Sequence, residues 1–458
     1  MSIRDDAQKT VHMTGTEEMQ KKAEIVAEYF PLSQLLPQNP VMQDTPECRS
    51  LYFIKLREYI ARVNRENGWY ETAELEAYEK LLRANRDSDQ KRDFSYYQYF
   101  LLLDTVFILG GRITEKEMEL LQAEHRQAGF ANNRQDARVA EALLKAFARE
   151  PVWLDGLLRK PRLSNEREYI RLMRRNRQFQ QKKPCTLLVT ATMSAGKSSF
   201  INALAGKKLC KSRVEACTGK IHTIYNKAFE DGLSYEYDHA LVLTAGAEEL
   251  MDDNEENQSD SIAIAAKFDG KLKNTRLLIN DSPGVNFSGC AEHRDITRRM
   301  LETGNYDILL YVMNATQLAT QDEDEHLNFV KKTVGTTPVI FVLNKVDELD
   351  PEEEDLVRTL CAMREYLEEK GFPQPLICPV SARAGWMAKN MEKGSLSRRE
   401  TMWLETTEDL LEELDIPGYY KKAFPRLPKS RCSSEQERLL RASGIVYIEE
   451  IIMRTGRN

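Results

Sequence analysis

The chain has 458 residues, of which 41% are hydrophobic and 30% charged, and its formal net charge is −7. This length allows about three domains of ordinary size, and the acidic balance excludes a protein whose whole surface matches nucleic acid or an acidic membrane. The eight cysteines are scattered without Cys-x-x-Cys spacing, and residues 1–20 lack an apolar signal core. Both features argue against export and predict reduced thiols in the cytoplasm.

The first part of the chain, up to about residue 182, has apolar residues at three- and four-residue steps and no alternating strand pattern. Helices are expected at residues 48–66, 71–86, 94–109, 115–127 and 136–149. The most apolar of these stretches contains Asp104 and is shorter than the roughly 20 apolar residues of a membrane-spanning helix. It therefore predicts a buried helix, and a membrane-inserting hairpin is the alternative.

From residue 183 onward, short β-rich runs alternate with helical stretches, which predicts a parallel sheet wrapped by helices. The expected strands are residues 185–190, 262–268, 275–280, 308–313, 339–343 and 376–380. Runs that are apolar on both faces suit central strands, and open α/β sheets bind ligands at the carboxyl ends of such strands. The polar motifs of this half of the chain follow those ends.

The first motif is the loop after the first expected strand, residues 191–198, which reads Ala-Thr-Met-Ser-Ala-Gly-Lys-Ser. Phosphate binding needs converging backbone N–H groups at a helix N-terminus, a lysine for the terminal phosphates and a hydroxyl for Mg²⁺. Gly196, Lys197 and Ser198 fit these three roles. Ala191 stands where this motif has its leading glycine, and its methyl group is compatible with the turn if φ is negative. The expected contacts to nucleotide are Ser194, Ala195, Gly196, Lys197, Ser198 and Ser199.

Three further motifs also follow expected strands. Asp281 begins an Asp-Ser-Pro-Gly motif, in which the carboxylate would reach Mg²⁺ through water and the Gly284 N–H would touch the γ-phosphate. Asn-Lys-Val-Asp347 is the most informative, because a fixed aspartate accepts both N1–H and the exocyclic amine of guanine, a donor pair that adenine lacks. A Ser-Ala motif after the last strand places a backbone N–H near guanine O6. The expected base contacts are Asn344, Lys345, Asp347, Ser381 and Ala382.

The remaining element is a switch threonine, which binds Mg²⁺ and positions water only when γ-phosphate is present. Thr218 is the candidate and Thr223 is the alternative. Together the motifs predict a Mg²⁺-dependent GTPase that hydrolyses GTP to GDP and phosphate, with Lys197, Thr218 and Gly284 as catalytic groups and Ser198, Thr218 and Asp281 as metal ligands. The expected fold class is α/β, a P-loop GTPase domain with a mainly parallel sheet, preceded by an all-helical domain.

With these motifs in place, the chain resembles the dynamin-like GTPases, particularly the bacterial members of that family. The residues that carry the resemblance are Ser194 and the double serine Ser198-Ser199 in the loop, and a long segment before Asp281 with an acidic stretch at 247–256. The resemblance implies that GTPase domains pair in the GTP state, that pairing stimulates turnover with Ser194 as a catalytic residue, and that a membrane surface is a candidate partner.

The chain departs from related GTPases at three positions near the expected γ-phosphate. Met193 stands where typical dynamins have a catalytic glutamine, and Thr190 stands where they have an aspartate. Val285 occupies the position of the water-orienting glutamine of Ras-like enzymes. A slow GTPase switch, or an assembly factor that binds the ribosome or another complex, is therefore the alternative function. Nucleic acid is expected as a partner only through a ribosome.

Two domains are expected, a helical domain at 1–182 and a dynamin-like GTPase domain at 183–458. Residues 446–453, which follow Ser443 and Gly444, resemble the last helix of a GTPase domain. A helical insertion is therefore expected near 396–440, and a long downstream stalk is not expected. The expected location is the cytoplasm, with peripheral attachment to a membrane left open.

Overall fold

The computed structural model places a large part of the chain, and some of the expected features lie outside it. Thr218, Val285 and the acidic stretch 247–256 fall outside the described residues. Within the described residues the chain divides into two compact units, with the boundary between Lys182 and Lys183. Each unit is described by itself. The described residues are 36–67, 73–84, 91–109, 113–130, 133–148, 156–210, 221–228, 230, 234–237, 241–242, 261–284, 291–350, 355–428 and 434–456.

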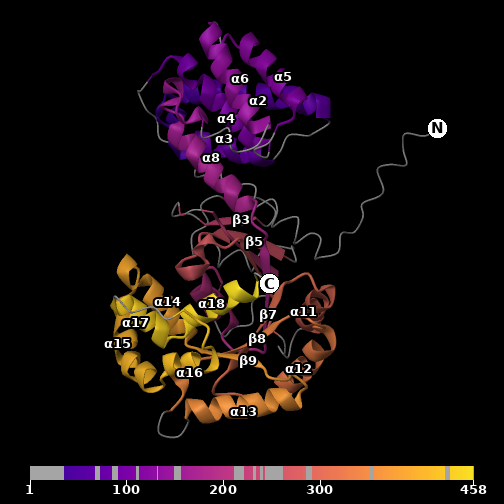
Figure 1. The fold of residues 1–458 in the computed structure, drawn as a ribbon, viewed down its shortest axis with the longest axis vertical. Helices are drawn as coiled ribbons and strands as arrows, with labels where there is room; N and C mark the ends of the chain where they lie inside the picture. The colour runs from indigo at the N-terminus through magenta and orange to yellow at the C-terminus, as the bar shows by residue number, and fades with distance from the viewer. Residues whose placement is uncertain are drawn as a thin grey trace, which may run out of the picture. The chain divides into compact units, whose positions relative to one another are not determined.

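The first unit is helical throughout its described residues (Figure 1). The central helix α2 packs against α3, α4 and α5, and α6 packs against α4 and α5. The capping box of Thr114 and Glu117 fixes the start of α5, because each side chain binds the backbone N–H of the other. The helices are α2 (Pro46–Asn67), α3 (Ala73–Ala84), α4 (Gln98–Ile108), α5 (Glu115–Gln127), α6 (Arg134–Ala148) and α8 (Arg167–Gln180), with short 3₁₀ turns η2 (Leu36–Gln38), η3 (Pro40–Gln43), η4 (Phe94–Tyr97) and η5 (Pro161–Leu163).

Helix α4 is the buried centre of this unit, as its apolar sequence predicts. Nine of its residues are buried, including Asp104, which is 1% exposed. Its carboxylate accepts hydrogen bonds from Tyr52 (2.5 Å), Tyr78, Tyr169 and the Asn39 amide (3.0 Å). These donors come from α2, α3, α8 and the turn before α2, so one carboxylate ties most of the unit together.

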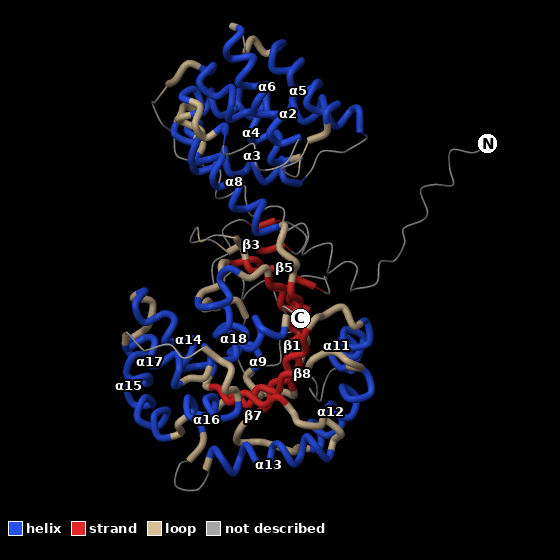
Figure 2. The backbone as a smooth tube through the Cα atoms, viewed as in Figure 1, coloured by secondary structure: helices blue, strands red, loops and turns tan. Residues whose placement is uncertain are grey.

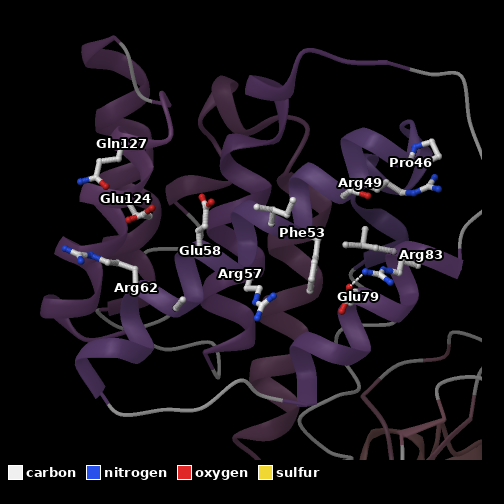
Figure 3. A pocket seen from close by; sticks show the side chains of 14 residues that line it. Pro46, Arg49, Phe53, Arg57, Glu58, Arg62, Glu79, Arg83, Glu124 and Gln127 are labelled. Atoms are coloured by element: carbon white, nitrogen blue, oxygen red, sulfur yellow. Dashed lines mark ion pairs between the residues drawn. The ribbon is translucent and has the colours of Figure 1, made fainter.

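A groove of about 820 Å³ opens on the surface of the helical unit between α2, α3 and α5 (Figure 3). Arg57 and Glu58 of α2 both line it, and Arg83 of α3 pairs with Glu79 at one end. Ile54, also on α2, is 51% exposed. Charges of both signs therefore alternate along the groove.

The second unit is built on one sheet, which has nine strands in the described part of the chain (Figure 2). Their order is β4-β3-β5-β2-β6-β1-β7-β8-β9. The five strands from β6 to β9 run parallel, whereas β2 is antiparallel to β6 and β3 is antiparallel to both its neighbours. The strands are β1 (Cys185–Ala191), β2 (Ile221–Asn226), β3 (Tyr235–Tyr237), β4 (Leu241–Val242), β5 (Ser261–Ala266), β6 (Leu277–Asp281), β7 (Ile308–Asn314), β8 (Val339–Asn344) and β9 (Leu376–Val380).

Helices cover both faces of the sheet, with α11 and α12 on one side and α9, α14 and α18 on the other (Figure 2). The central strands β1, β7 and β8 are almost entirely buried, as expected for strands between two helical layers. The expected α/β class with a mainly parallel sheet is confirmed. The helices are α9 (Lys197–Ala205), α11 (Ala291–Thr303), α12 (Gln321–Thr333), α13 (Leu356–Glu369), α14 (Ala382–Asn390), α15 (Arg398–Glu413), α16 (Ile416–Ala423), α17 (Glu435–Ala442) and α18 (Ile445–Thr455).

The C-terminal helix α18 packs against α9 and η6 (Gly270–Asn274). Buried Glu449 of α18 accepts from the Lys389 ammonium of α14 at 2.5 Å and from the Lys271 N–H at 3.1 Å. Lys389 also donates to the carbonyl of Leu204 at the end of α9 (3.0 Å). These bonds fix α14 and α18 to the helix that begins at Lys197.

Candidate functional site

The loop between β1 and α9 has the backbone geometry of a phosphate-binding loop. Gly196 has φ +84° and precedes the first residue of α9, and Ser194 has φ +63°. A Cβ atom at Gly196 would lie 2.3 Å from the Asn344 amide nitrogen, so only glycine fits at this position. Ala191 ends β1 and is not among the residues with positive φ. Alanine is therefore compatible with the turn, as predicted.

Asn344, at the carboxyl end of β8, connects this loop to the loop after β9. Its amide nitrogen donates to the carbonyls of Ala195 (3.0 Å) and Gly196 (3.4 Å), and its amide oxygen accepts from the Ala382 N–H (3.1 Å). Ser381 caps α14 by accepting from the Ala384 N–H at 3.1 Å. One buried side chain thus holds together three of the motifs that the sequence predicts.

Lys197 and Asp281 form a buried ion pair beneath the loop. The Lys197 ammonium donates to one oxygen of Asp281, and the two side chains are 9% and 3% exposed. Nδ1 of His222, on the adjacent strand β2, lies 3.9 Å from the other oxygen. Burial alone would raise the pKa of Asp281, but the charge of Lys197, followed by His222, holds it below its ordinary value. Asp281 is therefore ionised at neutral pH.

A cavity of about 340 Å³ lies beside the loop, and its walls come from four different parts of the unit. Gly196 and Ser199 belong to the phosphate-binding loop and α9, and Lys345 and Asp347 follow β8. Burial raises the pKa of Asp347, and a hydrogen bond with Ser381 acts against that rise. The cavity has the size of a small-ligand site and a carboxylate at its wall. Ala382, Arg383, Trp386 and Met387 of α14 and Asn202, Lys208, Glu348 and Glu400 complete the lining, with Asn344.

The predicted site residues thus fall into two groups that share the loop. Gly196, Ser199, Asn344, Lys345, Asp347 and Ala382 line the cavity. Lys197 and Asp281 form the ion pair, and Ser198 follows Lys197 in the first turn of α9. A Cβ atom at Gly284 would lie 3.9 Å from the Cα atom of Met193, which places the Asp-Ser-Pro-Gly turn next to the loop.

The two threonine candidates for the switch have different outcomes. Thr218 lies outside the described residues. Thr223 is 1% exposed within β2, where it pairs with Asn280 of β6. Because Thr223 is a sheet residue and the switch requires a loop, Thr218 stays the candidate.

Two of the departures from related GTPases can be located. The Thr190 hydroxyl shares a hydrogen bond of 2.8 Å with Nε2 of His326, a buried residue of α12 whose pKa burial lowers to about 3. Met193 is 38% exposed at the rim of the loop. Ser194 is also exposed there. The Thr190 side chain is completely buried in β1 and the Met193 side chain is apolar, so neither side chain is suited to orient a water molecule at the rim.

The site also has neighbours that no sequence motif predicts, namely His222, Lys208, Trp386 and Glu400. His222 belongs to a strand that was not expected, and the other three belong to no motif.

A metal site made only of protein ligands is not indicated, because the described residues contain no cluster of three or more His, Cys, Asp or Glu side chains suited to a metal. In the part of the chain that the structure describes, every helix falls short of the length and hydrophobicity of a membrane span.

The strand order, the loop geometry and the order of the motifs define a P-loop GTPase domain. Residues 187–346 match the sequence model of the dynamin family. A bacterial dynamin-like protein of Nostoc punctiforme is 29% identical over 190 residues, which make up 36% of this chain and 26% of that protein. The GTPase domain of this chain is dynamin-like.

Other proteins also resemble part of this chain. Sulfate adenylyltransferase subunit 1 of Bacteroides fragilis is 24% identical over 45% of this chain and 39% of its own length. GTPase Era of Glaesserella parasuis is 32% identical over 25% of this chain and 35% of its own length. The chain thus spans less than two-fifths of the length of each of these relatives and of the Nostoc protein. A chain from the solved structure of an oligomerised bacterial dynamin pair aligns over 91% of this chain and 61% of its own length, with 15% identity and a TM-score of 0.37.

Proposed function

We propose that this chain binds GTP with Mg²⁺ and hydrolyses it, and that pairing of two GTPase domains stimulates the hydrolysis. The observation that carries the proposal is the exposed rim formed by Met193 and Ser194 beside Gly284. Thr190 is buried and the Met193 side chain is apolar, so the described part of the catalytic arrangement lacks a side chain at the rim that would orient the attacking water. A second copy of the domain that covers this rim would exclude solvent and complete it.

The 340 Å³ cavity supports guanine as the base. Its Asp347 carboxylate would accept from N1–H and the exocyclic amine of guanine. The Ala382 N–H, which donates to Asn344 in this structure, would be shared with guanine O6 when the base is bound. Adenine would leave the Asp347 carboxylate without a donor, and an unmatched buried polar group costs free energy. Asn344 is proposed to act by holding these loops, because its amide is already used by Ala195, Gly196 and Ala382.

The residues beneath the loop fit Mg²⁺, which prefers oxygen ligands and usually keeps several waters in addition to phosphate oxygens. Ser198 offers a hydroxyl, and the ionised Asp281 offers a carboxylate that would act through water. Thr218 is proposed as the further ligand. When bound, the ion neutralises charge on the β- and γ-phosphates.

Lys197 would then change partner. In this structure its ammonium is held by Asp281, and a triphosphate in the loop would draw it to the β- and γ-oxygens, where it stabilises developing charge. The Gly284 N–H would touch the γ-phosphate, and Thr218 would position the water for in-line attack. Ser194 would act in the paired state.

The test is GTP turnover per molecule across the micromolar range. We expect turnover to rise with protein concentration, because only paired domains carry the complete rim. Ser194→Ala should lower the stimulated rate about 10-fold or more when both proteins are saturated with GTP, so that a change in nucleotide affinity does not enter the comparison. Lys197→Ala is the inactive control.

Turnover that stays flat with concentration, together with a monomer in the presence of a transition-state analogue, would contradict pairing. Co-sedimentation then distinguishes the remaining partners. GTP-dependent pelleting with liposomes supports a membrane surface as the partner, and nucleotide-dependent pelleting with ribosomes supports the alternative of a slow switch or assembly factor.

A further inference from the structure

Three side chains from separate elements meet at the wall of the cavity that we assign to the nucleoside. The Lys208 ammonium lies over the Trp386 ring, 4.5 Å from its centroid, and donates to Oε1 of Glu400 at 3.3 Å. Trp386 belongs to α14, Glu400 to α15, and Lys208 to the segment that leaves α9. All three line the cavity.

Both ends of this contact are held in place. Buried Asn202 of α9 accepts from the N–H groups of Leu209 (2.8 Å) and Cys210 (2.9 Å), which fixes the segment that carries Lys208. Glu400 takes part in the capping box of α15, because its Oε2 accepts from the Ser397 N–H at 2.8 Å while Oε1 is directed to Lys208.

Helix α15 makes a second contact with the same cavity wall. The guanidinium of Arg383, which lines the cavity, lies over the ring of Trp403 at 3.9 Å from its centroid. Trp403 is one turn beyond Glu400 on α15, so one face of this helix supports two of the cavity's cationic side chains. A change in the position of α15 would therefore reach the cavity directly.

We propose that Lys208, held between Trp386 and Glu400, is a positioning residue that closes the nucleoside cavity, so that helix α15 sets how long guanine nucleotide stays bound. This inference rests on the proposed function of the cavity. Lys208 is 47% exposed in its side chain, and a lysine free in solvent would sample many rotamers. Fixing it before the ligand arrives lowers the entropy cost of closing the cavity.

The experiment is a dissociation chase of radiolabelled GDP from the full chain with Mg²⁺. Glu400→Gln keeps the capping box, since glutamine also serves at that position, and removes only the charge that holds Lys208. We expect it to speed dissociation by up to about five-fold, the upper range for a partly exposed ion pair. Lys208→Met should speed dissociation at least as much. Glu405→Gln, an exposed charge on the same helix outside the cavity, should leave the rate unchanged.

The double variant separates positioning from a general effect on α15. If Glu400 acts through Lys208, adding Glu400→Gln to Lys208→Met should change the rate no further, and Tm should be equal in all variants. A rate for Glu400→Gln equal to that of Glu405→Gln, or an effect that persists in the Lys208→Met background, would overturn the proposal. A wild-type chain that never retains GDP would instead refute the nucleotide site itself.

Discussion

The helical unit and the GTPase unit each contain a buried aspartate, Asp104 and Asp281, whose pKa values are shifted in opposite directions. Asp104 is 1% exposed and Asp281 3% exposed. Burial raises the pKa of Asp104 to about 6, although hydrogen bonds from Tyr169 and its other neutral donors act against the rise. The pKa of Asp281 is lowered, because the charge of Lys197 outweighs the effect of burial.

The difference separates a carboxylate that builds a fold from one that is ready for chemistry. The tyrosine hydroxyls around Asp104 belong to three helices, which they hold to one carboxylate. Their own pKa values are raised well above the ordinary value, first by burial and then by Asp104. Asp281 instead pairs with Lys197, the cation that we propose moves to the phosphates when nucleotide binds. A buried carboxylate paired with such a cation could exchange that partner for a ligand.

The largest expected effect comes from removing the cation beneath the loop. Lys197→Met should lower the free energy of unfolding by about 3–5 kcal/mol in the absence of nucleotide, because it leaves the buried Asp281 carboxylate unpaired. It should also abolish tight binding of GTP. Urea unfolding measures the first effect and titration calorimetry the second.

The matched control is the pair of substitutions Lys197→Met and Asp281→Asn. Removing both charges should restore most of the lost stability without restoring nucleotide binding, since the unpaired charge is gone but the phosphate partner is still absent. If Lys197→Met alone unfolds like the wild type, the ion pair contributes nothing and the contrast with Asp104 fails.

The next effect is the pH dependence of stability that Asp104 contributes. Its pKa is raised from 3.8 to about 6 on folding, so the folded state binds the extra proton. The stabilisation is fully present below pH 3.8, falls as pH rises through about 6, and amounts to about 3 kcal/mol. Asp104→Asn, which stays neutral, should lack this loss. Relative to that variant, the wild type should therefore lose stability between about pH 4 and pH 6.

Hydrogen exchange of peptides from α4 measures this effect in the full chain, because those amides report the helical unit separately from the GTPase unit. The difference between the two proteins removes contributions from other groups, such as Glu166, whose pKa burial raises to about 7. A difference that is constant with pH would show that Asp104 stays ionised, as Asp281 does, and would remove the contrast between the units.

Much of the fold can be predicted from the sequence where apolar residues form a clear helical or strand pattern. The strand at 376–380 and the helix at 115–127 were expected with the bounds that the structure has. Strand β2 was missed, because His222, Thr223 and Asn226 make it read as polar. All six of its residues are buried, and this becomes apparent only when β5 and β6 pair on its two edges.

In the site, too, some residues can be predicted from the sequence and others are brought together only by packing. Residues that follow the carboxyl end of a strand can be found from spacing, and Asn344, Gly196 and Ala382 lie together in the structure. Their contacts with nucleotide remain a prediction. Lys208 and Glu400 are 192 residues apart in the chain and meet only through packing of α15. The Asp104 cluster was predicted only as a buried helix, since no pattern along the chain indicates which tyrosines reach the carboxylate.

A third carboxylate sharpens the comparison with the smallest expected effect. Burial raises the pKa of Asp347, as it raises that of Asp104, and the hydrogen bond with Ser381 acts in the opposite direction. Asp347 also lines the cavity proposed for the nucleoside, so, like Asp281, it belongs to the proposed site. Asp347→Asn should leave the fold intact but lower the affinity for GTP, relative to that for xanthosine triphosphate, by about 100-fold. The new amide nitrogen can donate to the extra carbonyl of xanthine, whereas the carboxylate oxygen that accepted from guanine is lost. Competition binding of the two nucleotides measures the shift. If preference for guanine persists in the variant, the base is recognised by groups other than Asp347, and this carboxylate would belong with Asp104 as a part of the architecture.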